Sequence, residues 1–131
     1  MSRLPRLDRP GAWFHVMNRG IDRRVVFPDA LHIRVFLAHL ARAVRRGEIE
    51  VHAFCVLGTH YHLLLRSPEG RLSDALRRVQ NAYVRWYNRR ARRDGPLFRG
   101  RFRSRPVLSE RYHDVLVRYI EANPVQARLV E

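Results

Sequence analysis

The chain has 131 residues, one cysteine and a formal charge of +14, and all 26 of its basic side chains are arginine. This length suits a single domain covering residues 1–131, which can bury a core without disulfide bonds. No apolar run approaches the ~20 residues that a membrane-spanning helix needs, and the N-terminus is too charged for an export signal. We therefore expect a cytoplasmic protein with no membrane partner.

The arginine content indicates a polyanionic partner. A guanidinium group matches phosphate oxygens with two parallel hydrogen bonds and can stack on bases. Genome composition can explain why arginine replaces lysine, but it does not explain the excess of positive charge. Nucleic acid is the favoured partner, with an anionic membrane surface as the alternative.

The first half of the chain predicts a strand, a helix and a hairpin. Residues 12–18 are rich in aromatic and β-favouring side chains, and His15 among them is expected to be a strand residue rather than a ligand. Residues 30–46 place apolar side chains at helical spacing, and a glycine then ends the helix. Two apolar runs, 50–57 and 60–66, are separated by two residues, which favours antiparallel pairing.

The second half predicts a long helix, a fourth strand and a last helix. Residues 72–92 carry an apolar stripe at helical spacing. An arginine-rich segment, 97–106, leads into a strand that continues to residue 108, and a helix from 109 to about 122 ends before Pro124. The order β-α-β-β-α-β-α predicts an α+β, ferredoxin-like fold with an antiparallel four-stranded sheet and packed helices.

The third predicted strand opens with His60-Tyr-His-Leu-Leu. Side chains two residues apart on a strand leave the same face, so His60 and His62 are expected side by side, with Tyr61 packing on the opposite face. Two such imidazoles can bind a metal, or they can be partly buried side chains that share hydrogen bonds. The apolar residues around them place this strand in the centre of the predicted sheet.

Arginine alternates with two phenylalanines in residues 97–106, a pattern that suits single-stranded nucleic acid, because arginine binds phosphates and rings stack on bases. A basic edge strand with buried phenylalanines is the alternative. Together with arginines outside the helical stripe, this segment supplies the predicted DNA-binding residues, namely Arg19, Arg78, Arg85, Arg89, Arg99, Arg101, Arg103, Phe98 and Phe102.

The last predicted helix places Tyr112, Tyr119 and Asn123 on one face. Tyr119 and Asn123 are one turn apart, about 6 Å along the axis. If this face meets the histidine strand, Asn123 offers a third metal ligand and Tyr119 a nucleophile that can attack phosphorus. A divalent ion such as Mg²⁺ or Mn²⁺ would act there as a Lewis acid on the scissile phosphate.

Four segments together resemble the REP-associated tyrosine transposases, which are relatives of the HUH-class single-strand transposases of insertion sequences. They are Met17-Asn-Arg-Gly20, His60-Tyr-His-Leu-Leu, Gly95-Pro-Leu-Phe-Arg-Gly-Arg-Phe102 and Tyr119-Ile-Glu-Ala-Asn-Pro-Val125. The resemblance covers roughly residues 10–131, and the segments stand in the family's order. Where the family usually has Pro-Asn before the histidine pair, this chain has Gly58-Thr59.

The resemblance implies an enzyme that binds single-stranded DNA containing a hairpin from palindromic repeats, cuts it, and rejoins strands. Carried over onto this sequence, His60, His62 and Asn123 are the ligands of a Mg²⁺ or Mn²⁺ ion. Tyr119 is the nucleophile that keeps the 5′ phosphate as a phosphotyrosine and releases a 3′ hydroxyl. The family implies a bacterial protein associated with the nucleoid, and a monomer rather than a dimer.

Two alternatives stay open at this point. Tyr112, Tyr83 or Tyr87 could replace Tyr119 as the nucleophile, although only Tyr119 stands four residues before Asn123. The chain could also be a non-catalytic protein that binds structured single-stranded DNA or RNA through arginine and aromatic contacts. Both functions use the positive charge, but only the enzyme needs Tyr119 and the two histidines.

Overall fold

The computed structural model describes residues 9–107, so the predicted last helix, with Tyr119 and Asn123, lies outside the described residues. The elements, in chain order, are β1 (Ala12–Arg19), a 3-10 turn η1 (Ile21–Arg23), α2 (Ala30–Arg45), β2 (Glu50–Val56), β3 (His60–Ser67), α3 (Leu72–Ala91) and β4 (Arg103–Pro106). The predicted bounds agree within one or two residues except in β4, which is shorter than expected.

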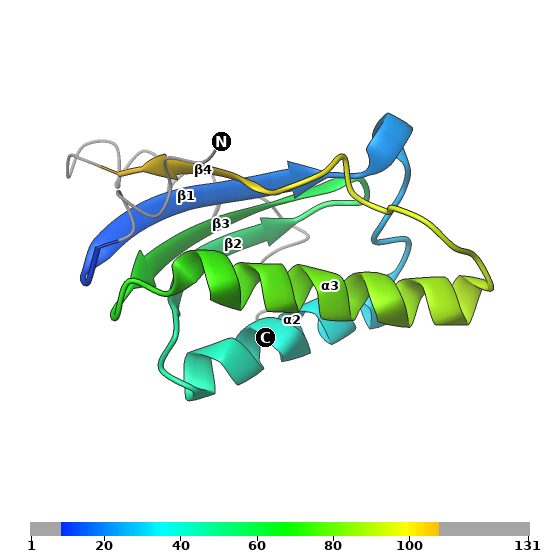
Figure 1. Ribbon diagram of the computed structural model, residues 1–131. Helices are drawn as coiled ribbons and strands as arrows, with labels where there is room; N and C mark the ends of the chain where they lie inside the picture. The colour runs from blue at the N-terminus through cyan, green and yellow to red at the C-terminus, as the bar shows by residue number, and fades with distance from the viewer. Residues whose placement is uncertain (1–8, 108–131) are drawn as a thin grey trace.

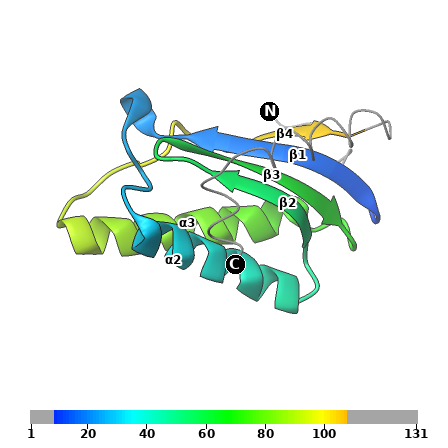
Figure 2. The same ribbon diagram turned by 180° about the vertical axis from the view of Figure 1, so that it is seen from behind.

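The four strands form one antiparallel sheet in the order β2-β3-β1-β4. Figures 1 and 2 show α2 and α3 side by side on one face of this sheet. The α+β prediction is therefore confirmed over the described residues. So is the central position of the histidine strand, because β3 is hydrogen-bonded to β1 on one side and to β2 on the other.

The main core lies between the sheet and the two helices. On β3 the alternate residues Tyr61, Leu63 and Leu65 are at most 2% exposed and pack into it. Alternation along the strand then sends His60, His62 and Leu64 to the other face, where Leu64 packs in a small separate cluster with Ala53. No helix within residues 9–107 is long and apolar enough to cross a membrane.

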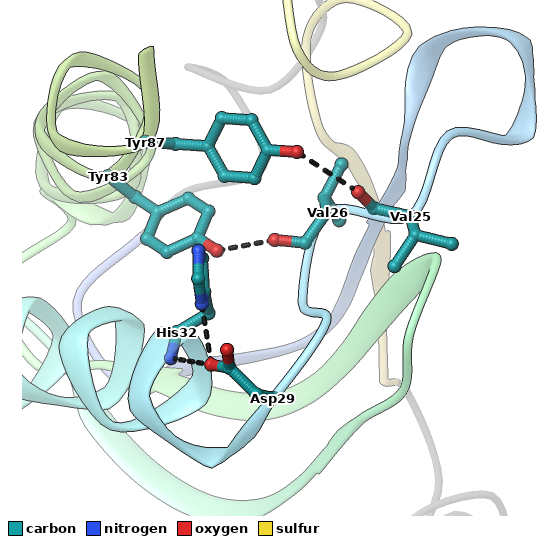
Figure 3. Close-up of polar contacts among 6 residues, drawn as sticks. All are labelled: Val25, Val26, Asp29, His32, Tyr83 and Tyr87. Carbon is teal, nitrogen blue, oxygen red and sulfur yellow. Dashed lines mark hydrogen bonds and ion pairs between the residues drawn. The ribbon is translucent and has the colours of Figure 1, made fainter. Parts of the chain in front are cut away.

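Two tyrosines of α3 tie the connection after β1 to the helical layer. Figure 3 shows the hydroxyl of Tyr83 donating to the carbonyl of Val26, and that of Tyr87 donating to Val25 at 3.4 Å. Tyr83 is fully buried, and burial raises the pKa of its phenol well above the usual range. Tyr83 therefore belongs to the core of the domain.

The same region also holds the start of α2. Asp29 caps this helix by accepting from the backbone N–H of His32 at 3.0 Å, and its carboxylate also contacts the His32 ring at 2.6 Å (Figure 3). A side-chain acceptor of this kind satisfies a backbone donor that the first turn leaves unpaired. Asp29 therefore sets where α2 begins.

We expect Tyr83→Phe to lower the free energy of unfolding by about 1–3 kcal/mol, because the buried Val26 carbonyl would lose its donor from Tyr83. Tyr87→Phe is the matched control, since its hydroxyl makes a longer contact at 3.4 Å. Urea unfolding of both variants measures the difference. Equal losses would mean that the Tyr83 hydroxyl has no special role in holding the connection.

Candidate functional site

The predicted histidine pair lies on the face of the sheet opposite the helices. The strand register sets Arg19 opposite His60, and Met17 of β1 and Cys55 of β2 on the two sides of His62. The rings of His60 and His62 are 5.1 Å apart between centroids and nearly perpendicular. The structure therefore brings the two histidines side by side, as their spacing predicts.

A third histidine, His15 of β1, joins the pair. Its Nε2 lies 3.1 Å from Nδ1 of His62, and the two rings stack at an interplanar angle of 16°. The expectation that His15 is a strand residue is confirmed, but its contact with His62 was not predicted. His60 has a comparable partner, because its Nδ1 lies 3.1 Å from the hydroxyl oxygen of Thr59.

Burial favours the neutral form of all three imidazoles. It lowers the pKa of His62 to about 4, with a smaller contribution from the neighbouring His15 and His60. Burial also lowers the pKa of His60, and burial together with the charge of Arg105 lowers that of His15. A neutral imidazole keeps the lone pair that binds a metal, so the pair is in its ligating form at neutral pH.

The arrangement fits two of the ligands of a metal site. In ligand histidines one ring nitrogen commonly has a protein partner and the other binds the metal; the Nδ1 contacts of His60 and His62 provide such partners. Within residues 9–107, no group of three or more His, Cys, Asp or Glu side chains is placed to hold an ion. The predicted third ligand, Asn123, lies outside the described residues.

An arginine-lined cleft runs beside the histidines along β1. Its cavity measures about 350 Å³ and is lined by Met17, Asn18, Arg19, Arg99, Arg101 and Arg103. Met17 and Arg19 pair with His62 and His60 across the strands, so the cleft borders the histidine site. Four of the predicted DNA-binding arginines therefore meet at one place, which we call the β1 cleft.

Arg105 was not among the predicted DNA-binding residues, although it stands directly opposite His15 in the register of β1 and β4. Paired residues of neighbouring strands share a face. Its charge therefore belongs to the histidine face of the sheet. The alternation of arginines in residues 99–105 was the signal that could have included it.

Buried hydrogen bonds hold the arginine segment against β1. Asn18 donates to Oε1 of Gln80 at 2.8 Å and to the carbonyl of Gly100 at 3.0 Å. Tyr61 donates to the same Gln80 oxygen at 2.8 Å, and its ring is 2% exposed, so its predicted packing on the opposite face is confirmed. These contacts join β1, β3, α3 and the segment before β4.

Gly20 allows a close backbone approach at the end of β1. A Cβ atom on this residue would lie 2.2 Å from the carbonyl oxygen of Arg24, which no side chain could tolerate without movement of the backbone. Next to it, the N–H of Arg99 donates to the carbonyl of Arg19 at 2.9 Å. This close approach explains why the Met17-Asn-Arg-Gly20 segment ends in glycine.

The first phenylalanine of residues 97–106 does not take the predicted role. Phe98 is 3% exposed and packs against Phe27, Tyr61 and Tyr83, so the prediction that its ring stacks on a base is wrong. A bridge between Gly20 and Phe98 brings the ring into the core. Phe102 is partly buried and packs against the same core. The alternative, a basic edge strand with buried phenylalanines, describes this segment better.

The other predicted DNA-binding arginines lie on the helical layer, away from the histidines. Arg78, Arg85 and Arg89 are exposed on α3. Arg78 makes an ion pair with Glu48, which follows α2. The structure does not bring these three residues to the β1 cleft.

Comparison with known proteins identifies the family. Residues 9–123 match the model described as "Transposase IS200 like". No curated protein matches the sequence.

Two solved structures share the fold. A REP-associated tyrosine transposase bound to a REP hairpin is 21% identical with a TM-score of 0.68, over 91% of this chain and 69% of that one. A transposase structure from Deinococcus radiodurans R1 is 20% identical with a TM-score of 0.58, over 84% of this chain and 88% of that one. The family match spans most of the sequence, so this chain belongs to the IS200-like transposase family.

Proposed function

We propose that this transposase-family protein cuts and rejoins single-stranded, hairpin-containing DNA through a phosphotyrosine on Tyr119, with a divalent metal bound by His60, His62 and Asn123. The observation that carries the proposal is the position of the neutral His60 and His62 beside the β1 cleft. A DNA strand held by this cleft would present a phosphate next to the histidines. The similar transposase bound to a REP hairpin supports DNA as the partner.

The arginines of the β1 cleft bind and orient the strand in this proposal. Arg19, Arg99 and Arg101 line one cavity. Guanidinium groups bind phosphate oxygens in a fixed geometry, and the hydrogen bonds of Asn18 hold the segment that contains Arg99 and Arg101. The cleft can therefore place a phosphate rather than only attract DNA.

The histidines and Asn123 would hold Mg²⁺ or Mn²⁺, which polarises the scissile phosphate and offsets negative charge in the transition state. The protein's own contribution is to keep the imidazoles neutral and oriented. His15 and Thr59 contact Nδ1 of His62 and of His60, respectively. Neighbours of this kind fix the orientation of a ligand histidine.

The Tyr119 oxygen attacks phosphorus in the proposed step. The bond from phosphorus to the 3′ oxygen breaks, this oxygen takes up a proton and becomes a free 3′ hydroxyl, and the 5′ phosphate remains on the tyrosine. The number of phosphate ester bonds does not change. Attack by a 3′ hydroxyl on the phosphotyrosine reverses the step and joins strands without ATP. We propose that a monomer carries out this reaction.

The proposal predicts a covalent adduct that requires a metal. Incubation of the protein with single-stranded DNA from the palindromes beside its gene, in the presence of Mn²⁺, should give a protein–DNA band that survives denaturing electrophoresis. EDTA should abolish the band, because the metal offsets charge at the phosphate. An adduct of equal yield in EDTA would overturn the metal assignment.

A further inference from the structure

The helical layer carries a second basic cavity, which we call the α2–α3 groove. One arginine of α2, the arginine that caps this helix and two arginines of α3 line it, with a histidine and a carboxylate; these residues are Arg42, Arg46, Arg78, Arg85, His39 and Glu48. It opens on the side of the helices, whereas the histidine pair occupies the opposite face of the sheet. The groove and the β1 cleft are therefore separate surfaces.

Small side chains create this groove. Along α2 and its C-terminal cap, His39, Arg42 and Arg46 follow each other at spacings of three and four residues, which keeps them on one side of the helix. The lining also contains the buried Ala43 and Ala75, whose short side chains leave room between the helices. The cavity measures about 230 Å³, whereas one water molecule in the liquid occupies about 30 Å³.

The charge of the groove is mostly uncompensated. Glu48 pairs with Arg78, but Arg42, Arg46 and Arg85 form no ion pair with any carboxylate of residues 9–107. His39 lines the same cavity as Arg42 and Arg85, and burial together with the charges of these two arginines lowers its pKa. Like charges gathered around one cavity are stabilised by an anion.

The spacing of the arginines favours a chain of phosphates over a single anion. Arg78 and Arg85 are seven residues apart on α3, which is about 10.5 Å along a helix axis. The two side chains therefore enter the groove from positions about two helical turns apart. A nucleic-acid backbone carries a charge at every nucleotide, so successive phosphates can occupy both ends of the groove.

We infer that the α2–α3 groove binds the phosphate backbone of DNA, as a second contact on the layer opposite the histidines. The inference rests on the proposed function in taking DNA as the polyanion. A substrate long enough to fill the β1 cleft continues around the domain to the helices. The groove then adds affinity and orientation while the β1 cleft holds the strand to be cut.

A charge-matched pair of variants on the same helix tests the groove. Arg42→Gln/Arg46→Gln removes two groove charges, and Arg34→Gln/Arg45→Gln removes two exposed charges of α2 that do not line it. Fluorescence anisotropy with a hairpin DNA carrying a single-stranded extension measures affinity across salt concentrations. We expect the groove variant to bind about tenfold more weakly, with a log–log salt slope shallower by about 1.5. The control should stay within about threefold of the original protein, with its slope unchanged.

Equal losses in both variants would overturn the inference, because only total charge would then matter. Glu48→Gln is a third variant, for which we expect the opposite effect on DNA affinity. Glutamine carries no negative charge, and its amide oxygen can still accept from Arg78. Its amide nitrogen can donate at the position of Oε1 of Glu48, a buried atom with no hydrogen-bond partner among the described residues. Hairpin affinity should rise about threefold; unchanged or weaker binding would contradict a phosphate site.

The adduct assay separates this inference from the proposed function. In one outcome the protein forms no covalent adduct, but DNA affinity falls in the Arg42/Arg46 variant and rises in the Glu48 variant. The groove then binds DNA, and the proposed cleavage is wrong. In the other outcome the protein forms the adduct, but these variants bind DNA like their controls. The proposed cleavage is then supported, and the groove does not bind DNA. Thermal unfolding of each variant confirms that the fold is retained.

Discussion

Tyr119→Phe should abolish the covalent protein–DNA adduct while leaving hairpin binding within about threefold of the original protein. Phenylalanine has no oxygen to attack phosphorus, so no phosphotyrosine can form. We expect adduct formation to fall by at least about 10³-fold, as for loss of other covalent nucleophiles. Denaturing electrophoresis of labelled DNA gives the adduct yield, and anisotropy with the same oligonucleotide gives the affinity.

Tyr112→Phe is the matched control, because Tyr112 shares the predicted helical face and is the other tyrosine there. It should keep the adduct. If Tyr112→Phe loses the adduct and Tyr119→Phe keeps it, the nucleophile has been assigned to the wrong residue. If the original protein binds the hairpin but never forms an adduct, with any divalent metal, the alternative of a non-catalytic DNA-binding protein holds.

The fold could be predicted because local signals agree with one another. Helical spacing of apolar residues sets α2 and α3. The short link predicted between the runs 50–57 and 60–66 favours antiparallel pairing, which β2 and β3 adopt. The fourth strand was the weakest part of the prediction. Arginine is poorly diagnostic of an edge strand, and β4 spans only Arg103–Pro106, paired with part of β1.

The histidine pair could be predicted from strand alternation alone, but its surroundings could not. His15 stands 47 residues before His62 and meets it only through the register of β1 against β3, which no local pattern specifies. For Phe98 the local sequence pattern was misleading. Its alternation with arginines indicates a surface strand, yet the bridge to Gly20 turns its ring into the core.

The arginines form two groups that composition alone cannot separate. Those of residues 99–103 lie beside Arg19 on the histidine side, whereas Arg78 and Arg85 lie in the α2–α3 groove. A single positive field would attract DNA in any orientation. If both arginine surfaces bind DNA as proposed, they restrict which part of the DNA reaches His60 and His62, because one of the surfaces lies beside these histidines.

His60→Ala should remove cleavage at the Mn²⁺ concentration that supports the original protein, yet leave DNA affinity nearly unchanged. The side chain is half-buried, and within residues 9–107 the hydrogen bond of its ring is to the neighbouring Thr59, so truncation should not unfold the sheet. Loss of a residue that merely supports a ligand costs about 10- to 100-fold. Loss of a ligand itself should therefore lower the adduct yield at saturating DNA by more than about 100-fold.

His52→Ala is the control for His60→Ala, because it removes an exposed histidine from the neighbouring strand β2, where its ring contacts Glu50 and Trp13. It should cleave normally at every Mn²⁺ concentration. A His60→Ala protein that is rescued by higher Mn²⁺ retains a weakened site, as expected for removal of one ligand. Full activity without added metal would show instead that His60 only fills space on the sheet, and the proposed metal site would be wrong.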